Sequence, residues 1–311
     1  MSVAEAYGFN FASESCEKLV WSKYPCRKCI PCLIARQKAW VSRLTEELEN
    51  HENNYFVTLT YDDSFVPVSE NGEMTFNKQH LIKLNRDLRK RFQQGFLSNP
   101  YKDVIAGSPA TFDLPKDVHY KYYITSEYGP SGTFRPHYHA VFYGLQVPIH
   151  VAELLFRELW PYGFVSVFPA EAGAAGYISK YLVTDGVGKN AYNGTEHEDK
   201  PFALMSKGLG LSYVERMGDF HRADTRRMYV QKHGIKSRMD RYLKHKIYDE
   251  DTLSEYADKC LKQHSDLKNK YAYFQSEHPL LYVRLMEERA AYFQEQRDSI
   301  RWKTIKQHSL K

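Results

Sequence analysis

The chain has 311 residues, of which 14% are aromatic and 26% are charged, and a net formal charge of +5. This length allows one large domain, or one domain with appendages, and a sizeable buried core. No apolar run is long enough to span a bilayer, and the first 18 residues lack the basic start and apolar core of a secretory signal. We therefore expect a protein without membrane association, in a reducing compartment where cysteines are more often free, reactive or metal-bound than paired.

The elements predicted from hydrophobic periodicity form a regular series. In chain order they are a helix over Leu33 to Glu49, a strand over Tyr55 to Tyr61, a helix over Asn77 to Phe92, strands over Tyr120 to Glu127 and Arg135 to Leu145, a helix over Val151 to Trp160, a strand over Phe164 to Phe168, and a helix from near Glu171 to about Val183. Residues 62–75, 93–117 and 185–218 are expected to be loops, and 249–311 mostly helical. The order predicts an α+β fold in which helices pack on one face of an antiparallel sheet.

Two basic islands interrupt an otherwise acidic chain. From Lys18 to Arg43 there are seven Lys or Arg and no Asp or Glu, and from Arg222 to Lys246 there are nine basic and two acidic residues. These segments carry +7 each, so the rest of the chain carries 5 − 14 = −9. Such islands indicate polyanion contact sites, although two solvated helix or loop faces would have the same composition.

His137 and His139 are separated by one residue on a predicted strand. Because side chains alternate along a strand, both imidazoles should point to the same face, where they could hold a divalent cation. The hairpin turn should bring Glu127 opposite the start of this strand as a third ligand. Tyr138 should then face the helices and pack in the core. The alternative is a pair of ordinary strand histidines, which the apolar run AVFYGL that follows makes harder to accept.

Tyr177 and Tyr181 are four residues apart and should share one face of a helix, with Lys180 nearly on that face. A tyrosine oxygen can attack a phosphodiester and keep the 5′-phosphate as a phosphotyrosine. Lys180 could stabilise the phenolate or the departing oxygen. With 24 tyrosines in the chain, packing of an unremarkable pair is the alternative.

Four of the five cysteines lie in the first 32 residues. Cys26, Cys29 and Cys32 have C-x₂-C-x₂-C spacing, and Cys16 is a candidate fourth ligand, a set that suits a tetrahedral structural Zn²⁺. An iron–sulfur cluster or free thiols remain alternatives. Cys260 is expected to be a lone helical cysteine.

Together these segments resemble one family. YFVTLTY at 55–61, RPHYHAVFYG at 135–144 and YISKYL at 177–182 follow the order of the three motifs of HUH rolling-circle initiators, and the last is similar to the double-tyrosine motif of phiX-type A proteins. The N-terminal PCRKCIPCLIARQKAW and the distal GIKSRMDRYLKHKIY resemble gokushovirus replication initiators of the Microviridae. The resemblance covers most of the chain.

The resemblance implies a central sheet of the HUH endonuclease type and a phage protein that acts in the host bacterial cytoplasm. It implies that His137 and His139 bind Mg²⁺ or Mn²⁺ and that Tyr177 and Tyr181 are nucleophiles. The protein would nick single-stranded phage origin DNA, leave a 3′-OH primer, rejoin the displaced strand into a circle, and work with the host replication helicase and polymerase.

On this basis we expect three parts: a Cys-rich basic segment with a helix over 1–50, the endonuclease core over 51–186, and a basic loop with a helical region over 187–311. Basic residues at the edges of these parts are candidate DNA contacts: Arg27, Lys28, Arg36, Lys38, Arg135, Lys236, Arg238 and Arg241.

Two competing functions remain at this stage. A non-catalytic DNA-binding module would use the basic islands and tyrosine stacking and would form no covalent adduct. A metal-dependent hydrolase would use H-x-H to activate water and would release free products.

Overall fold

The computed structural model describes residues 2–11, 30–105, 107–129, 135–179, 201–232 and 235–309. Of these, residues 30–34, 172, 232, 235–238, 264, 293 and 296–309 are described by their backbone alone. The chain forms two compact units, which we call the sheet unit, Lys28–Tyr248, and the end unit, Met1–Arg27 with Asp249–Lys311. Within the described residues, no helix combines the length and the apolar character needed to cross a bilayer.

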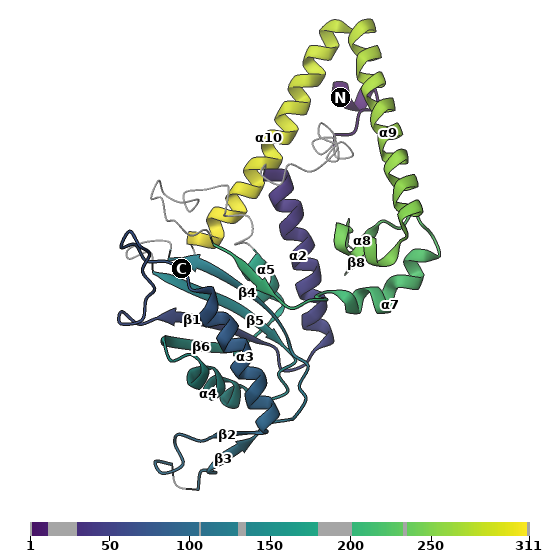
Figure 1. Cartoon of the computed structure of the whole chain (residues 1–311). Helices are drawn as coiled ribbons and strands as arrows, with labels where there is room; N and C mark the ends of the chain where they lie inside the picture. Colours follow the sequence, from purple (N-terminus) through teal and green to yellow (C-terminus); the bar gives the residue numbers. More distant parts are fainter. Residues whose placement is uncertain are drawn as a thin grey trace. The chain divides into compact units, whose positions relative to one another are not determined.

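A five-stranded antiparallel sheet with the order β6-β1-β5-β4-β7 organises the sheet unit (Figure 1). Its strands are β1 (Tyr55–Tyr61), β4 (Lys121–Tyr128), β5 (Pro136–Tyr143), β6 (Gly163–Pro169) and β7 (Ala203–Met205). The first four match the strands predicted from the sequence to within two residues at most ends. They form because β-branched and aromatic residues alternate between two faces, as the buried odd positions of YFVTLTY show.

Helices cover both faces of this sheet (Figure 1). On one face lie α3 (Lys78–Gln94) and α4 (Ile149–Leu159), and the predicted stripe Leu81, Leu84, Leu88 and Phe92 is buried there. On the other face lie α2 (Ile30–Asn50) and α5 (Ala172–Ser179), packed through Leu44, Ala175 and Ile178 onto Tyr123 and Val141. The expectation that helices occupy one face alone was therefore wrong, because α2 and α5 also bury apolar side chains against the sheet.

Two predicted loops contain secondary structure. Segment 93–117 includes a two-stranded sheet, β2 (Phe96–Ser98) with β3 (Thr111–Asp113), and segment 185–218 includes β7 and most of α7 (Leu211–Arg222). Strands of three residues are too short for a period to be recognised, and the αL residue Gly210 that begins α7 made a loop more plausible. The sheet unit is completed by β8 (Tyr229–Lys232), β9 (Ile235–Arg238) and α8 (Arg241–Ile247).

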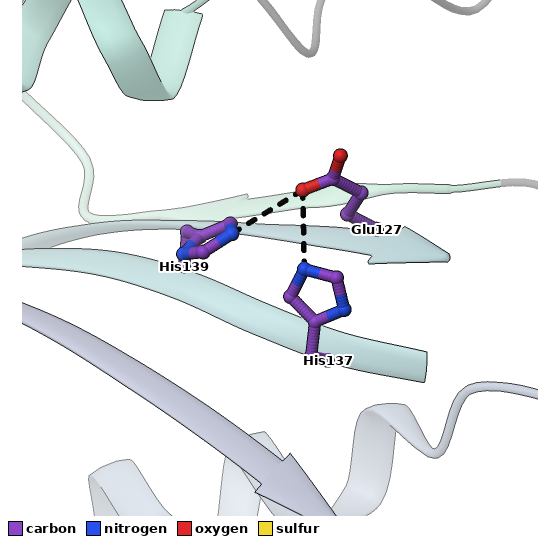
Figure 2. Close-up of side chains that lie close together, drawn as sticks. All are labelled: Glu127, His137 and His139. Carbon is purple, nitrogen blue, oxygen red and sulfur yellow. Dashed lines mark hydrogen bonds and ion pairs between the residues drawn. The ribbon is translucent and has the colours of Figure 1, made fainter. Parts of the chain in front are cut away.

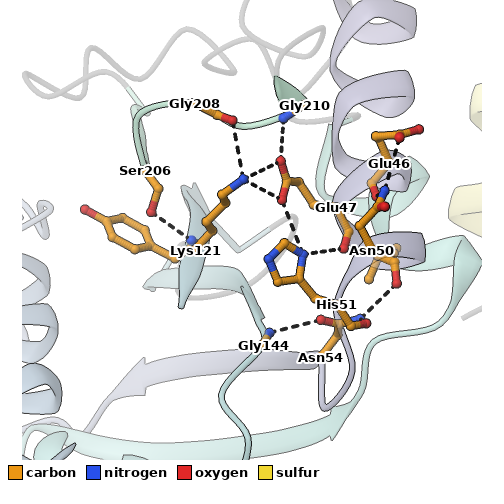
Figure 3. A network of polar contacts seen from close by, with 12 residues as sticks. Glu46, Glu47, Asn50, His51, Asn54, Lys121, Gly144, Ser206, Gly208 and Gly210 are labelled. Carbon is orange, nitrogen blue, oxygen red and sulfur yellow. Dashed lines mark hydrogen bonds and ion pairs between the residues drawn. The ribbon is translucent and has the colours of Figure 1, made fainter. Parts of the chain in front are cut away.

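Two adjacent buried carboxylates fasten α2 to the rest of the sheet unit (Figure 3). Glu47 accepts hydrogen bonds at 3.0 Å from the ammonium of Lys121 on β4, and another from the backbone of Gly210. Glu46 forms a two-pronged pair with Arg216 of α7, at 2.8 and 2.9 Å. A buried charge is costly unless it is paired, so these contacts fix α2 over one half of the sheet face.

The end unit combines α1 (Val3–Ala6) with two long helices, α9 (Glu250–Glu277) and α10 (Pro279–Ser309). The predicted helical C-terminal region is therefore confirmed in the described residues. Phe9 and Phe274 pack together in the core of this unit, with ring centroids 5.2 Å apart. The part boundaries expected at residues 50 and 186 were drawn from motifs and stay a prediction.

Candidate metal centre and nucleophile

Glu127, His137 and His139 meet on the face of the sheet that α2 and α5 cover in part. Glu127 on β4 pairs directly with His137 on β5, as the hairpin argument predicted. His139 lies two residues further along β5, so its side chain projects to the same face. Strand alternation and one register therefore bring three candidate ligands together.

The three side chains converge on one point (Figure 2). A single carboxylate oxygen, Oε2 of Glu127, lies 3.1 Å from Nε2 of His137 and 3.2 Å from Nε2 of His139. One ligand atom from each residue can be chosen so that all lie within 4.8 Å of one another. His139 is buried and the other two side chains are partly buried. The group has the size and the atom types of a site that could hold a metal ion.

The Glu127 carboxyl group is ionised in this environment. Burial alone would raise its pKa, but the hydrogen bonds from His137 and His139, together with their charge, outweigh burial and hold the pKa at about 2. An ionised carboxylate is the form that coordinates a cation.

The outer nitrogens of both rings face oxygen atoms. His137 Nδ1 lies 3.2 Å from the carbonyl oxygen of Arg135, and His139 Nδ1 lies 3.2 Å from Oγ1 of Thr58. A carbonyl oxygen only accepts, so Nδ1 of His137 is assigned the hydrogen, and Nε2 of the neutral ring then carries a lone pair. That lone pair would repel the Glu127 oxygen unless a proton or a cation lay between them. The donor set therefore fits a cation, and outward hydrogen bonds of this kind commonly support metal-bound histidines.

Tyr138 points to the opposite face, as expected, and is fully buried. Its hydroxyl lies 3.1 Å from the hydroxyl of Tyr61 and accepts a hydrogen bond of 2.9 Å from the backbone of Asn77, the N-cap of α3. These bonds tie the strand segment between the two histidines to β1 and α3.

Tyr177 lies on α5 beside this group. Its ring meets the His139 ring edge to face at a centroid distance of 5.4 Å, and it meets the Phe56 ring at 5.5 Å. Ala175 and Ile178 of the same helix are fully buried against the sheet, and the small alanine lets α5 approach closely. Of the two predicted nucleophiles, Tyr181 lies outside the described residues, as does Lys180.

Other predicted site residues are placed unevenly. Arg135 bonds the carbonyl oxygen of Tyr61 at 2.8 Å and pairs with the carboxylate of Asp63, next to the histidine strand. Arg36 and Lys38 are exposed on α2, and Arg241 is exposed at the start of α8. The remaining predicted residues fall outside the described side chains: Cys16, Cys26, Arg27, Lys28, Cys29, Cys32, Lys236 and Arg238. Cys260 is a free, exposed cysteine on α9.

Two residues of the site escaped the sequence analysis, namely Thr58 and Phe56. Both lie on β1, where Thr58 pairs with His139 and Phe56 supports Tyr177. The available signal was the alternation of YFVTLTY, since its even positions must face away from the α3 core. The strand pairing needed to place them beside β5 is not contained in that pattern.

Comparisons with known proteins agree with this arrangement of motifs. Residues 54–186 match the model of a family described as replication-associated protein ORF2. The chain is 27% identical over 210 residues to the replication-associated protein ORF2 of Spiroplasma virus 4, covering 63% of this chain and 58% of that protein. It is 28% identical over 228 residues to the replication-associated protein VP4 of Bdellovibrio phage phiMH2K, covering 67% and 61%.

A third relative, the replication-associated protein ORF4 of Chlamydia phage 1, is 24% identical over 208 residues, covering 61% of this chain and 45% of that protein. The chain thus spans less than two thirds of the length of each of these relatives. No solved structure matches it significantly. The resemblance to phage replication-associated proteins is confirmed.

Proposed function

We propose that this chain, a relative of phage replication-associated proteins, is a rolling-circle initiator of the HUH type that nicks single-stranded origin DNA by tyrosine attack. The observation that carries the proposal is the position of Tyr177, whose ring packs on His139 of the Glu-His-His group. A nucleophile and a candidate cation site therefore share one sheet face, as a phosphoryl-transfer site requires.

Glu127, His137 and His139 are the residues that would hold the cation. When bound, Mg²⁺ or Mn²⁺ would supply positive charge to the scissile phosphate. A set of two imidazoles and one carboxylate favours Mn²⁺ over Mg²⁺, because Mg²⁺ prefers ligands that are all oxygen. Thr58 and the Arg135 carbonyl hold the two rings in the orientation that leaves Nε2 facing inward.

The chemistry assigned to Tyr177 is a transesterification. Its phenolic oxygen attacks phosphorus, an O–P bond forms to the 5′-phosphate, and the bond from phosphorus to the 3′-oxygen breaks. The phenolic proton leaves to solvent and the 3′-oxygen takes up a proton, so one phosphate ester replaces another and a 3′-OH primer results. Lys180 would stabilise the phenolate or the departing oxygen.

Tyr181 is assigned the second transfer. After the first cut, one tyrosine is blocked by the 5′ end of the displaced strand, so another nucleophile must cut the regenerated origin. The freed 3′-OH can then attack the first phosphotyrosine and close the circle. Tyr177 is favoured for the first cut because Lys180 follows it by three residues, as in single-tyrosine initiators. Host cytoplasm, helicase and polymerase belong to the same proposal.

The test uses origin-strand DNA with Mn²⁺, labelled at one end or the other, on a denaturing gel. A 3′-label should move with the protein, whereas a 5′-label should stay on a shorter strand that a polymerase can extend. Replacing both nucleophiles, Tyr177→Phe with Tyr181→Phe, should remove the adduct at little cost in volume. A hydrolase would release both labels free of protein, and a simple binding module would leave the strand uncut.

A further inference from the structure

Two phenylalanine rings stand in solvent on β6, an edge strand of the sheet (Figure 1). Phe164 is 68% exposed and Phe168 is 60% exposed. Among the described residues, neither ring is stacked on another aromatic ring, whereas Val167 between them is buried on the α4 side. Exposing two large apolar side chains on one strand has a cost in water, and such a patch marks a surface that binds something.

Strand register places both rings on the same sheet face as the candidate metal centre. Phe164 pairs with Thr60, which in turn pairs with His137. Residues directly opposite in antiparallel strands project to the same face, and neighbouring strands are about 4.8 Å apart. The strand that carries Phe164 therefore runs roughly 10 Å from the strand that carries His137.

The second ring flanks the nucleophile. Phe168 pairs with Phe56, and the Phe56 ring contacts both Tyr177 and His139. Ser166 lies between the two exposed rings and pairs with Thr58, the residue that bonds His139. The face thus continues without interruption from the site of phosphate chemistry to two exposed aromatic surfaces.

We infer that Phe164 and Phe168 form a base-stacking platform for the single-stranded DNA that enters the site. This inference rests on the proposed function. Bases on either side of the scissile phosphate must lie on a surface next to it, and aromatic rings on an open sheet are the usual platform for unpaired bases of any sequence. The separation of the rings, four residues or about 13 Å along the strand, leaves room for different nucleotides on each ring.

The first experiment measures binding of a fluorescent oligothymidine strand by anisotropy in EDTA, so that no cleavage is involved. Phe164→Ala and Phe168→Ala should each weaken binding by about 5- to 100-fold, whereas Phe164→Trp should restore it. Phe96→Ala is the matched control, because Phe96 is 45% exposed on a strand of a different sheet, and it should leave the affinity unchanged. With DNA at saturation, the rate of adduct formation should be nearly that of the wild type.

A strand that contains 2-aminopurine or an abasic position identifies stacking itself. Stacked 2-aminopurine should be quenched on the wild type and brighten in the alanine variant, and an abasic strand should bind both proteins equally. Wild-type affinity in both alanine variants would overturn the platform while leaving the nickase intact, whereas no single-strand binding by any form would overturn the proposed function as well. If the variants bind DNA normally but convert a dimer into a monomer in sedimentation, this surface is instead an interface between two copies.

Discussion

Glu127, His137 and His139 reach one point because each occupies the correct parity on a paired strand. A shift of register by one residue would send both imidazoles to the α3 side and expose Tyr138. The buried hydroxyl contacts of Tyr138 with Tyr61 and Asn77 make that shift costly, because it would leave polar groups unpaired. The residue between the ligands therefore helps to fix their positions.

The depressed pKa of Glu127 gives a prediction for the metal-free protein. Its folded pKa is about 2, below its ordinary value of 4.5, so the ionised carboxylate stabilises the fold above about pH 4.5 and loses that effect as the pH falls toward 2. Glu127→Gln should therefore lower the free energy of unfolding by about 1–3 kcal/mol near pH 5.

The measurement is urea unfolding of both proteins in EDTA across this pH range. The difference between them should shrink toward pH 2. A difference that is constant with pH would show that the glutamine acts through packing and that the imidazoles do not hold the carboxylate ionised.

The sequence predicted the residues of the candidate metal group well, since H-x-H parity and a hairpin count are local properties. It could not place Thr58 beside His139, because they are 81 residues apart and only the pairing of β1 with β5 connects them. The exposure of Phe164 and Phe168 was equally hidden, because a run of strand formers does not say which strand lies at the edge of the sheet.

At the scale of elements, β6 and α5 present the sheet face and the nucleophile, and each contains a glycine with a different role. A Cβ on Gly163 would overlap the carbonyl oxygen of Thr60 and the amide nitrogen of Asp62, which are backbone atoms and cannot yield. A Cβ on Gly176, next to Tyr177, would meet nothing within 4 Å.

Two alanine substitutions should thus have opposite effects on the free energy of unfolding. Gly163→Ala should lower it by about 1–3 kcal/mol through overpacking. Gly176→Ala should raise it by about 0.5–1 kcal/mol, because alanine restricts the unfolded chain and favours a helix. Urea unfolding measures both, and a loss of stability in Gly176→Ala would contradict the regular helical backbone of α5.

Long elements were predicted well from periodicity, because a stripe such as that of α3 repeats over several turns. The helix α7 and the strand β7 were missed for a different reason. Both depend on distant contacts, as when Arg216 of α7 pairs with Glu46 of α2 across 170 positions. Their own residues, which include Gly208 and Gly210, carry only a weak local preference.

At the scale of the whole molecule, the end unit is built from both ends of the chain. The Glu288 carboxylate on α10 accepts hydrogen bonds of 3.0 Å from the backbone amides of Val3 and Ala4, the start of α1. Helical composition predicted α9 and α10, but no pattern in the sequence predicts a contact between residues 285 positions apart.

Replacing this clamp should release the N-terminal segment. In Glu288→Ala, the amides of Val3 and Ala4 should exchange with deuterium markedly faster than in the wild type, because they lose their acceptors. Glu287→Ala, at the exposed neighbouring position, is the control and should leave exchange unchanged. Unaltered exchange in Glu288→Ala would show that the apolar contacts of Phe9 hold the segment without the carboxylate.

The central claim is that a tyrosine of this chain becomes covalently joined to DNA with the help of the Glu-His-His group. The most direct measurement is mass spectrometry of the peptides left on DNA after incubation with Mn²⁺ and nuclease digestion. We predict a nucleotide on the peptide that contains Tyr177 and Tyr181, formed by the wild type, lost in EDTA and lost in His137→Ala. An adduct on a different residue, or one that forms undiminished without a divalent cation, would contradict the account.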